Sequence, residues 1–306
     1  MSNWPGFVEV SPSVAAALAR RHPVVALESA VVSHGLPHPT GVQTAAALED
    51  IVRQGRAVPA TIAVLEGRIK VGLTARELQQ LTASSVMKVA ARDLPLAVAT
   101  GATGGTTVSA TISVGHLLGI QVVSTGGIGG VHLGAEETWD VSADLVALAR
   151  YPIAVVCAGA KAICDIGRTL EYLDTVGVTV VAYRTDRFPY FYSRDSGIVA
   201  PRRIDVPEDA ARILAAQHAL GQSSGLLIAH AVPEEDALAG ELVRDAVQRA
   251  TERAHAAGVH GGDLTPYLLA VLAEMTGGKS LQANLALLRA NAELAAQISV
   301  AIARLG

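Results

Sequence analysis

The sequence predicts an α/β fold, in which helices cover a mostly parallel sheet and the C-terminal third is helical. Apolar, strand-like runs alternate with segments of helical spacing, and short glycine-rich links join them. From Pro233 onward the patterns are mainly helical. No internal repeat, linker or low-complexity segment divides the chain, so we expect a single domain over residues 1–306.

The N-terminal elements follow in order. Residues 11–21 have helical spacing, and residues 23–32 indicate a buried strand that breaks at "SHGLPHPTG". Residues 41–55 predict a helix that ends on a glycine, as helices commonly do. Residues 59–73 predict a β-hairpin that turns at Glu66-Gly67, and Thr74 opens the next helix.

The middle of the chain continues the alternation. Residues 94–134 contain β-rich runs and Gly/Thr-rich turns around a helical segment at 107–119. Residues 138–161 predict a turn, a helix and a strand, and residues 162–185 a helix and a strand. Three long helical patterns complete the chain, at 233–258, 264–278 and 280–305.

Composition excludes several classes of protein. Of the 306 residues, 50% are hydrophobic and 17% charged, which excludes an extended disordered chain and suggests apolar subunit contacts. The net charge is −4 without a Lys/Arg cluster, so we expect no nucleic-acid partner. Cys157 and Cys164 form no CxxC pair, which argues against a disulfide framework or a zinc site. The N-terminus lacks a signal pattern and no run of 18 apolar residues occurs, so we expect no membrane partner and a cytoplasmic location.

Lys161 is the first candidate site residue. It follows the apolar run "IAVVCAGA" at the carboxyl end of a predicted parallel strand, where ligands bind in such sheets. Among alanines and glycines its amine would lose hydration, which favours the neutral form that can attack a carbonyl and form a Schiff base. The alternative is a solvated lysine in the first turn of the following helix.

Glu28 is the second candidate. The segment "VVALESAVV" places its carboxylate inside an apolar strand. An unpaired buried carboxylate is costly, so Glu28 is either paired or has a raised pKa that suits general acid/base work. A structural ion pair or a capped turn is the alternative.

The segment "TWDVSADLVALAR" contributes Asp140, Ser142 and Asp144. Asp140 or Ser142 would serve as the N-cap of the helix that follows. In the functional alternative, Asp140 binds a hard divalent cation largely through waters, and the turn from Ser142 to Asp144 meets the hydroxyls or phosphate of a ligand.

Other motifs are less specific. "TGATGGTTVSAT" and "STGGIGGVHLG" could cradle a phosphate with backbone N–H groups, although neither fits a nucleotide-binding pattern. The nine histidines form no HxH or HxxxH pair, which argues against a zinc hydrolase. The aromatic cluster Phe188, Tyr190, Phe191 and Tyr192 is either a lid over a planar ligand or a subunit contact.

Seven segments in order resemble the pseudouridine-5'-phosphate glycosidase family, also described as indigoidine-synthase-A-like. The likeness runs from about residue 10 to the last helix. Its segments are "ALESAVVSHGLPHPTGVQTA", "PATIAVLEGRIKVGL", "ATGATGGTTVSATISVGHLLGI", "STGGIGGVHLGAEETWDVSADL", "VVCAGAKAICDIGRTLEYL", "FPYFYSRDSG" and "TGGKSLQANLALL".

The resemblance implies a three-layer α/β/α fold, a homotrimer, and a manganese-dependent enzyme with one Mn²⁺ per subunit. Such an enzyme reversibly cleaves the C–C bond between uracil and ribose 5-phosphate. The resemblance makes Glu28 the proton donor, Lys161 the nucleophile and Asp140 the residue that holds Mn²⁺ through water. The substrate-contacting positions that it implies are Lys88 for the phosphate, Val108, Ser142, Ala143, Asp144, and Asn284 near the base.

This chemistry agrees with the residues. Uracil C5 is a poor leaving group for two carboxylates acting through an oxocarbenium-like transition state. If Glu28 protonates the ring oxygen and opens the sugar, Lys161 can attack C1' and provide an iminium as electron sink. Two alternatives remain: a Schiff-base aldolase or lyase on another phosphosugar, and a non-catalytic phosphosugar-binding protein.

Overall fold

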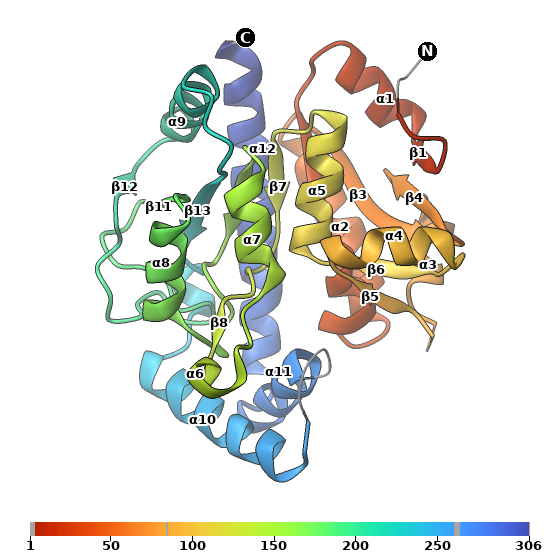
Figure 1. Cartoon of the computed structure of the whole chain (residues 1–306). Coiled ribbons are helices and arrows are strands. Elements are labelled where there is room, and N and C mark those ends of the chain that lie inside the picture. Colours follow the sequence, from red (N-terminus) through yellow and green to blue (C-terminus); the bar gives the residue numbers. More distant parts are fainter. Residues whose placement is uncertain (1–3, 84, 260–263, 306) are drawn as a thin grey trace.

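A mostly parallel sheet runs through the middle of the protein (Figure 1). The structure is a computed structural model that describes residues 4–83, 85–259 and 264–305. Five neighbouring strands are parallel, in the order β2 (Val24–Leu27), β7 (Val122–Ser124), β9 (Ala154–Cys157), β13 (Leu226–His230) and β11 (Thr179–Tyr183). Their nearly continuous apolar sequences suit strands that are buried on both faces.

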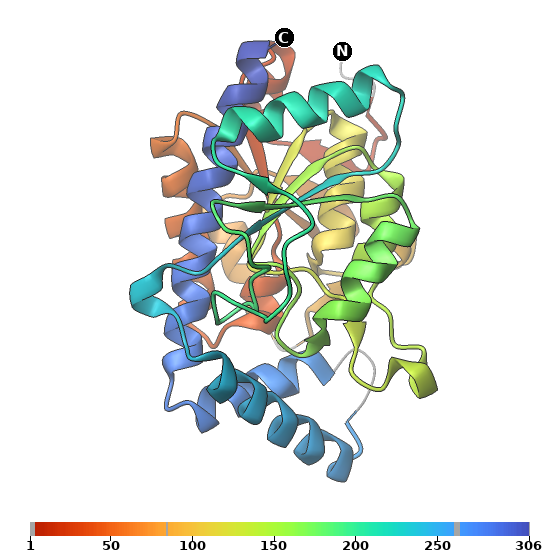
Figure 2. The same cartoon turned by 90° about the vertical axis from the view of Figure 1, so that its left-hand side faces the viewer.

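Helices cover both faces of this sheet, and Figure 2 shows the resulting three layers from the side. On one face α12 (Lys279–Leu305) packs against β2, β7 and β9, with α2 (Thr40–Gln54) and α9 (Pro207–Ala219) beside it. On the other face lie α5 (Val108–Leu118), α7 (Ala143–Arg150) and α8 (Ile166–Thr175). The predicted α/β fold is therefore confirmed.

The sheet extends beyond β2 in an N-terminal part of mixed direction. β3 (Val58–Leu65) pairs parallel with β2 and antiparallel with β4 (Arg68–Val71), so the predicted hairpin at Glu66-Gly67 is confirmed. β1 (Val8–Val10) runs parallel to β4. β6 (Gly104–Thr106) pairs antiparallel with β3, and β5 (Met87–Val89) pairs parallel with β6.

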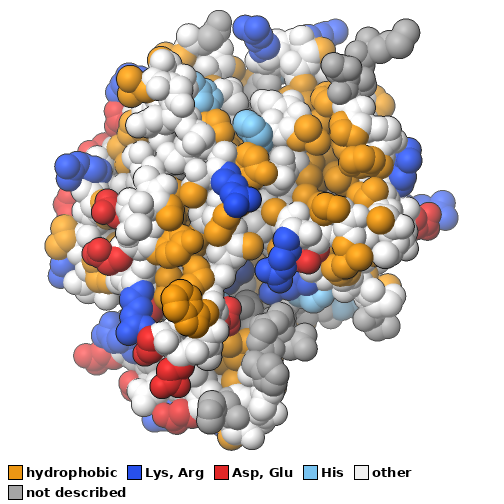
Figure 3. Space-filling view, viewed as in Figure 1, with side chains coloured by type: hydrophobic (Ala, Val, Ile, Leu, Met, Phe, Trp, Pro, Cys, Tyr) orange, Lys and Arg blue, Asp and Glu red, His pale blue; other side chains and the backbone are white. Residues whose placement is uncertain are grey.

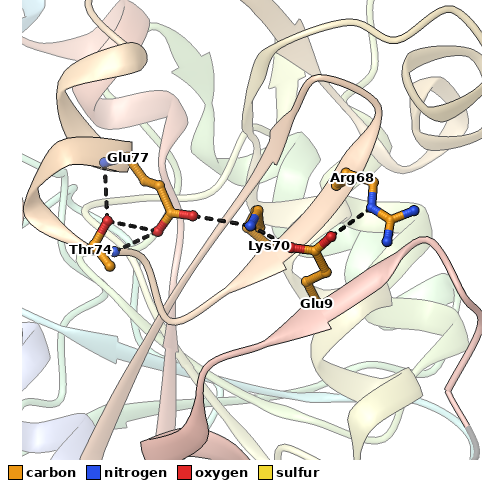
Figure 4. A network of polar contacts seen from close by, with 5 residues as sticks. All are labelled: Glu9, Arg68, Lys70, Thr74 and Glu77. Carbon is orange, nitrogen blue, oxygen red and sulfur yellow. Dashed lines mark hydrogen bonds and ion pairs between the residues drawn. The ribbon is translucent and has the colours of Figure 1, made fainter.

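A network of ion pairs ties this N-terminal part together (Figure 4). Glu9 of β1 accepts hydrogen bonds from Arg68, at 2.7 Å, and from Lys70 of β4. Lys70 also lies 3.1 Å from Glu77 in α3 (Ala75–Gln80). Thr74 and Glu77 form a capping box at the start of α3, so β1, β4 and α3 are held by one chain of contacts.

Further elements surround the sheet. The helices are α1 (Pro12–Ala19), α4 (Leu94–Ala99), α6 (Ala135–Thr138), α10 (Gly240–Ala256) and α11 (Leu264–Met275). β8 (Val131–His132) and β10 (Cys164–Asp165) form a separate antiparallel pair, and β12 (Arg203–Ile204) lies beside β11. Figure 1 shows α10 and α11 at the end of the molecule away from both termini. In the described part of the chain, α12 alone is long and apolar enough to cross a membrane, but 56% of its apolar window is buried, as expected of a core helix.

One predicted strand was too long. The sequence predicted a strand over residues 23–32, but β2 ends at Leu27 and a π-helical turn occupies Val31–Gly35. The cause is Ser29, whose hydroxyl donates to the Ile62 carbonyl at 2.5 Å and accepts from the Thr106 amide at 2.9 Å. These bonds to β3 and β6 take the chain out of the β2 ladder immediately after Glu28.

Candidate active site

The carboxyl ends of β2, β7 and β9 meet at one edge of the sheet. Glu28 directly follows β2, Thr125 directly follows β7, and Lys161 comes four residues after β9. Because these strands are parallel neighbours, residues from three distant parts of the sequence reach the same edge. The predicted position of Lys161 at such an edge is confirmed.

Glu28 is a buried carboxyl group with one direct partner. Its side chain belongs to a residue that is 9% exposed, and the Thr125 hydroxyl donates a hydrogen bond to Oε1. Burial raises the pKa of Glu28, and this effect outweighs the opposing influence of the Lys161 charge and the Thr125 hydrogen bond. A carboxyl group of this kind keeps its proton to higher pH, as a proton donor requires.

Thr125 is itself held in place by the helix layer that contains α12. Asn291 of α12, which is fully buried, donates from Nδ2 to the Thr125 carbonyl at 2.8 Å. The Glu28 carboxyl group is therefore oriented through the β7 end by a residue of the long C-terminal helix.

Lys161 lies in a turn between strand and helix. Its amide donates to the Ile128 carbonyl at 2.9 Å, and its carbonyl accepts from the Cys164 amide at 2.9 Å. The alternative that placed Lys161 in the first turn of a helix is wrong, because α8 begins at Ile166 after the N-cap Asp165. Ala160 and Ala162 beside it are buried, so small side chains surround the half-buried lysine.

A cavity of about 500 Å³ opens at this edge. Eight of the nine predicted site residues line it: Glu28, Lys88, Val108, Asp140, Ser142, Ala143, Asp144 and Lys161. The ninth, Asn284, lines a narrower cavity of about 50 Å³ together with Glu28, Lys88 and Lys161. All nine are thus brought together, and their individual roles stay predictions.

Lys88 brings a second amine to the cavity from β5. Burial lowers the pKa of Lys88, the charge of Lys161 lowers it further, and Asp144 and Glu28 oppose this change. Val108 lies close by as the first residue of α5, whose N-terminal end has a positive dipole. An amine beside a helix N-terminus is an arrangement that suits an anionic group such as a phosphate.

Asp144 holds two walls of the cavity together. One carboxylate oxygen accepts from the Ser109 amide and the other from the Gly129 amide, each at 2.8 Å. Ser142 accepts from the Asp144 amide and is the N-cap of α7, so the capping alternative is confirmed for Ser142 and is wrong for Asp140. Asp144 thereby fixes the start of α5 against the glycine-rich segment that follows β7.

Asp140 is the candidate metal ligand. It lines the cavity near His132, whose pKa is lowered by burial although Asp140 opposes the shift. Within residues 4–83, 85–259 and 264–305, no three His, Cys, Asp or Glu side chains converge as a metal cage would require. One carboxylate facing an open cavity suits a hard divalent cation that keeps most of its waters.

The structure adds residues for which the sequence predicted no functional role. Thr125, His34 and His132 all lie at this edge: Thr125 contacts Glu28, and both histidines line the cavity. The end of a predicted strand could have indicated Thr125, whereas nothing local distinguishes the two histidines. Both cysteines are buried, which raises their pKa values to about 12, so neither serves as a thiolate nucleophile.

Comparison with known proteins identifies the family of the chain. The family model described as "Indigoidine synthase A like protein" matches residues 13–301. The chain belongs to this family. The resemblance drawn from the sequence motifs is thereby confirmed.

Relatives and solved structures in the indigoidine synthase A-like family match over nearly the full length. A pseudouridine-5'-phosphate glycosidase of Methylobacterium nodulans is 53% identical over 96% of this chain and 88% of its own, and one of Caldanaerobacter subterraneus is 49% identical over 98% of both. The crystal structure of the prealnumycin C-glycosynthase AlnA in complex with ribulose 5-phosphate has a TM-score of 0.91 and 37% identity, covering 99% of both chains. An indigoidine synthase A-like protein of Thermotoga maritima has a TM-score of 0.90 and 35% identity, covering 99% of this chain and all of its own.

Proposed function

We propose that this protein is a pseudouridine-5'-phosphate glycosidase, which reversibly cleaves the C–C bond between uracil and ribose 5-phosphate. The observation that carries the proposal is the meeting of Lys161, Glu28 and Lys88 around one cavity at the carboxyl edge of the sheet. Identities of about half over nearly the whole chain, to relatives of that name, support it. A related structure is named as a C-glycosynthase and contains a pentose phosphate, which agrees with C–C chemistry on a phosphosugar.

Glu28 and Lys161 divide the proposed reaction between them. The Glu28 proton passes to the ring oxygen as the C1'–O bond breaks, and the Lys161 amine forms a bond to C1'. The Glu28 carboxylate takes the proton that the attacking nitrogen loses. The nitrogen lone pair then forms a C=N bond while the bond to uracil breaks, and the electron pair stays on uracil C5, which takes its proton from Glu28. Water hydrolyses the imine, which releases ribose 5-phosphate and restores the amine.

The cavity of about 500 Å³ is assigned to the phosphate and the sugar. Lys88 and the N-terminus of α5 at Val108 bind the phosphate, because both offer positive charge and hydrogen-bond donors to an anion. Ser142, Ala143 and Asp144 at the start of α7 line the sugar site, and Asn284 binds the base from α12.

Asp140 is the residue that would hold Mn²⁺, through bound water. When present, the ion supplies positive charge beside the sugar phosphate. The donor set supports this assignment, since a single carboxylate at an open cavity suits a hydrated ion better than a dry protein cage.

The proposed assembly is a homotrimer. Apolar side chains gather over α4 and α5, at the upper right of Figure 3, and support a subunit contact there. Phe7, Leu96 and Leu117 of this region are 40%, 55% and 48% exposed. Light scattering should give three times the mass of the chain, and a reduced mass for Leu117→Glu would place the contact at this surface.

The experiment that tests the proposed reaction traps the imine. The wild-type protein and the Lys161→Ala variant are each incubated with ribose 5-phosphate, Mn²⁺ and borohydride, and the masses of their peptides are measured by mass spectrometry. A reduced pentose-phosphate adduct on Lys161 that is absent from the variant, together with uracil-dependent formation of pseudouridine 5'-phosphate, is the expected result. An adduct without any reaction of uracil would identify a lyase or aldolase for another phosphosugar, and no adduct would overturn the mechanism.

A further inference from the structure

The aromatic segment Phe188–Tyr192 lies inside the protein, next to the proposed active site. Phe188 and Phe191 are each 2% exposed, and Tyr190 and Tyr192 are 8% and 3% exposed. The Tyr190 hydroxyl donates to the Ala162 carbonyl at 3.1 Å, which fastens the segment to the turn that contains Lys161. The segment is therefore part of the wall around the nucleophile.

Phe191 has an unusual backbone conformation within this wall. Its φ is +52°, a left-handed value that is rare for a bulky aromatic residue. Tyr190 and Ser193 exchange two backbone hydrogen bonds, of 2.9 and 3.0 Å, and so hold Phe191 in a tight turn. Strain of this kind persists only where the surroundings impose it, and it is concentrated at functional sites.

The Phe191 ring lies directly on Gly127, two residues after Thr125. A Cβ atom added to Gly127 would lie 2.5 and 2.7 Å from the ring carbons Cε2 and Cδ2, so any other residue at position 127 would displace the ring. The turn at 190–193 and the glycine after β7 therefore fix the ring from two sides.

The ring lines the narrow cavity of about 50 Å³, which we call the neck. Glu28, Lys88 and Lys161 belong both to the neck and to the cavity of about 500 Å³ assigned to the sugar phosphate. On its other side the neck shares lining residues with a third, largely apolar cavity of about 420 Å³: His34, Gly35, Leu269 and Asn284. A sugar bound at Lys161 can therefore direct the group attached to its C1' into the neck, away from the cavity assigned to the sugar phosphate.

We propose that Phe191 determines the aglycone specificity of this site, as a flat wall that binds a single planar ring in the neck and excludes fused rings. The inference rests on the proposed function, because it takes the sugar to be bound at Lys161. The neck has about a tenth of the volume of the sugar-phosphate cavity, so it leaves an aglycone less free space than the cavities that adjoin it. An aromatic face also binds a base by stacking. In proteins that bind single-stranded nucleic acid, such stacking contributes about five- to 100-fold in affinity for each base.

The test separates the sugar half of the reaction from the base half in Phe191→Ala. Alanine has the same Cβ as phenylalanine, so the backbone requirement at φ +52° is unchanged. Borohydride trapping of ribose 5-phosphate on Lys161 should stay within about twofold of the wild type. The KM for uracil in the synthesis direction should rise about tenfold. Pyrido[1,2-c]pyrimidine-1,3-dione, which is uracil with a second ring fused across N1 and C6 and leaves C5 free to face C1', should compete poorly against the wild type and at least tenfold better, relative to uracil, against the variant.

Phe188→Leu is the matched control. Phe188 belongs to the same segment and is equally buried, but its ring lies against Gly159 and does not line the neck. If a substitution only loosens the segment, trapping of ribose 5-phosphate and the KM for uracil should change together. If it removes the wall, as Phe191→Ala does, only the KM for uracil should change. Phe191→Leu, which keeps apolar volume but loses the flat face, provides the same comparison should Phe191→Ala fail to fold.

Three results would overturn the inference. These are a uracil KM within twofold of the wild type in both Phe191 variants, an equal loss of trapping and uracil affinity, and equal competition by pyrido[1,2-c]pyrimidine-1,3-dione before and after the substitution. Failure of the wild type to form the adduct would instead reject the proposed function itself, and this inference with it.

Discussion

Two groups of lysine and glutamate in this protein have opposite electrostatics. In the N-terminal network of Figure 4, the hydrogen bond from Lys70 chiefly lowers the pKa of Glu9, and the hydrogen bond to Glu9 raises the pKa of Lys70. At the edge of the central sheet, burial raises the pKa of Glu28 and lowers that of Lys88. The same residue types are held charged in one place and moved toward their neutral forms in the other.

The difference comes from contact and solvent. Glu9 and Lys70 touch each other, and their side chains are 40% and 26% exposed, so each charge has both a partner and water. Glu28 is buried with the Thr125 hydroxyl as its hydrogen-bond donor, so the loss of water dominates. A buried carboxyl group that is shifted toward its neutral form, such as Glu28, is a candidate for proton transfer, whereas the paired surface groups serve stability.

The largest expected effect is the loss of turnover when the amine of Lys161, which lines the same cavity as Glu28 and Lys88, is removed. Lys161→Ala should lower the turnover of pseudouridine 5'-phosphate by at least about 10⁴-fold, because it removes the group that forms the covalent bond. Lys70→Ala, the matched control in the surface network, should leave turnover within twofold. The assay is release of uracil, and comparable turnover losses in the two variants would refute the proposed role of Lys161.

The second prediction concerns the two carboxylates. Glu28→Gln should lower turnover by about 10²- to 10⁴-fold, the contribution of a positioned acid, because glutamine has no proton to give to the ring oxygen. Glu9→Gln should have no effect on turnover. An active Glu28→Gln enzyme would show that another group opens the sugar ring.

Glu28 also predicts a pH dependence of stability. Its pKa in the folded protein is raised above the ordinary glutamate value of about 4.5, so the folded state binds the proton more tightly than the unfolded chain does. The wild type therefore loses stability as pH rises from about 4.5 through the raised pKa, and Glu28→Gln does not. Between pH 5 and pH 8, the melting temperature of Glu28→Gln should increase relative to that of the wild type. A difference in melting temperature that does not depend on pH would contradict the raised pKa.

The fourth prediction tests Lys88 as the phosphate ligand. Lys88→Met should raise the KM for ribose 5-phosphate about tenfold to 100-fold, since a hydrogen bond to a charged group contributes about 1.5–3 kcal/mol. The KM for uracil should change little. An unchanged KM for the sugar phosphate would assign the phosphate to another part of the cavity.

The sequence predicted most helices and strands around the central sheet, because apolar runs and glycine-ended helices are local patterns. It placed Lys161 at a strand end and Glu28 in buried surroundings for the same reason. Its prediction of a β-rich run at the start of residues 94–134 was wrong, because Leu94–Ala99 forms the helix α4. It did not predict the end of β2, which depends on bonds from Ser29 to β3 and β6, or the role of Thr125, which depends on the pairing of β2 with β7. The position of Phe191 depends on contact with Gly127, 64 residues earlier in the chain. These features require contacts between distant segments, which no local pattern contains.

The smallest expected effect belongs to the surface network. Glu9→Gln should lower the free energy of unfolding by about 0.2–1 kcal/mol, because partly exposed ion pairs are screened by water. The pKa of Glu9 is lowered in the folded protein, so this stabilisation is present above about pH 4.5 and is lost as pH falls through the folded value. Urea unfolding of both proteins at pH 7 and pH 3 should show a difference at pH 7 that becomes smaller at pH 3 and in 1 M salt. The sign is opposite to that for Glu28, where acid favours the folded wild type, and finding the same sign in both variants would mean that the contrast between the two groups is wrong.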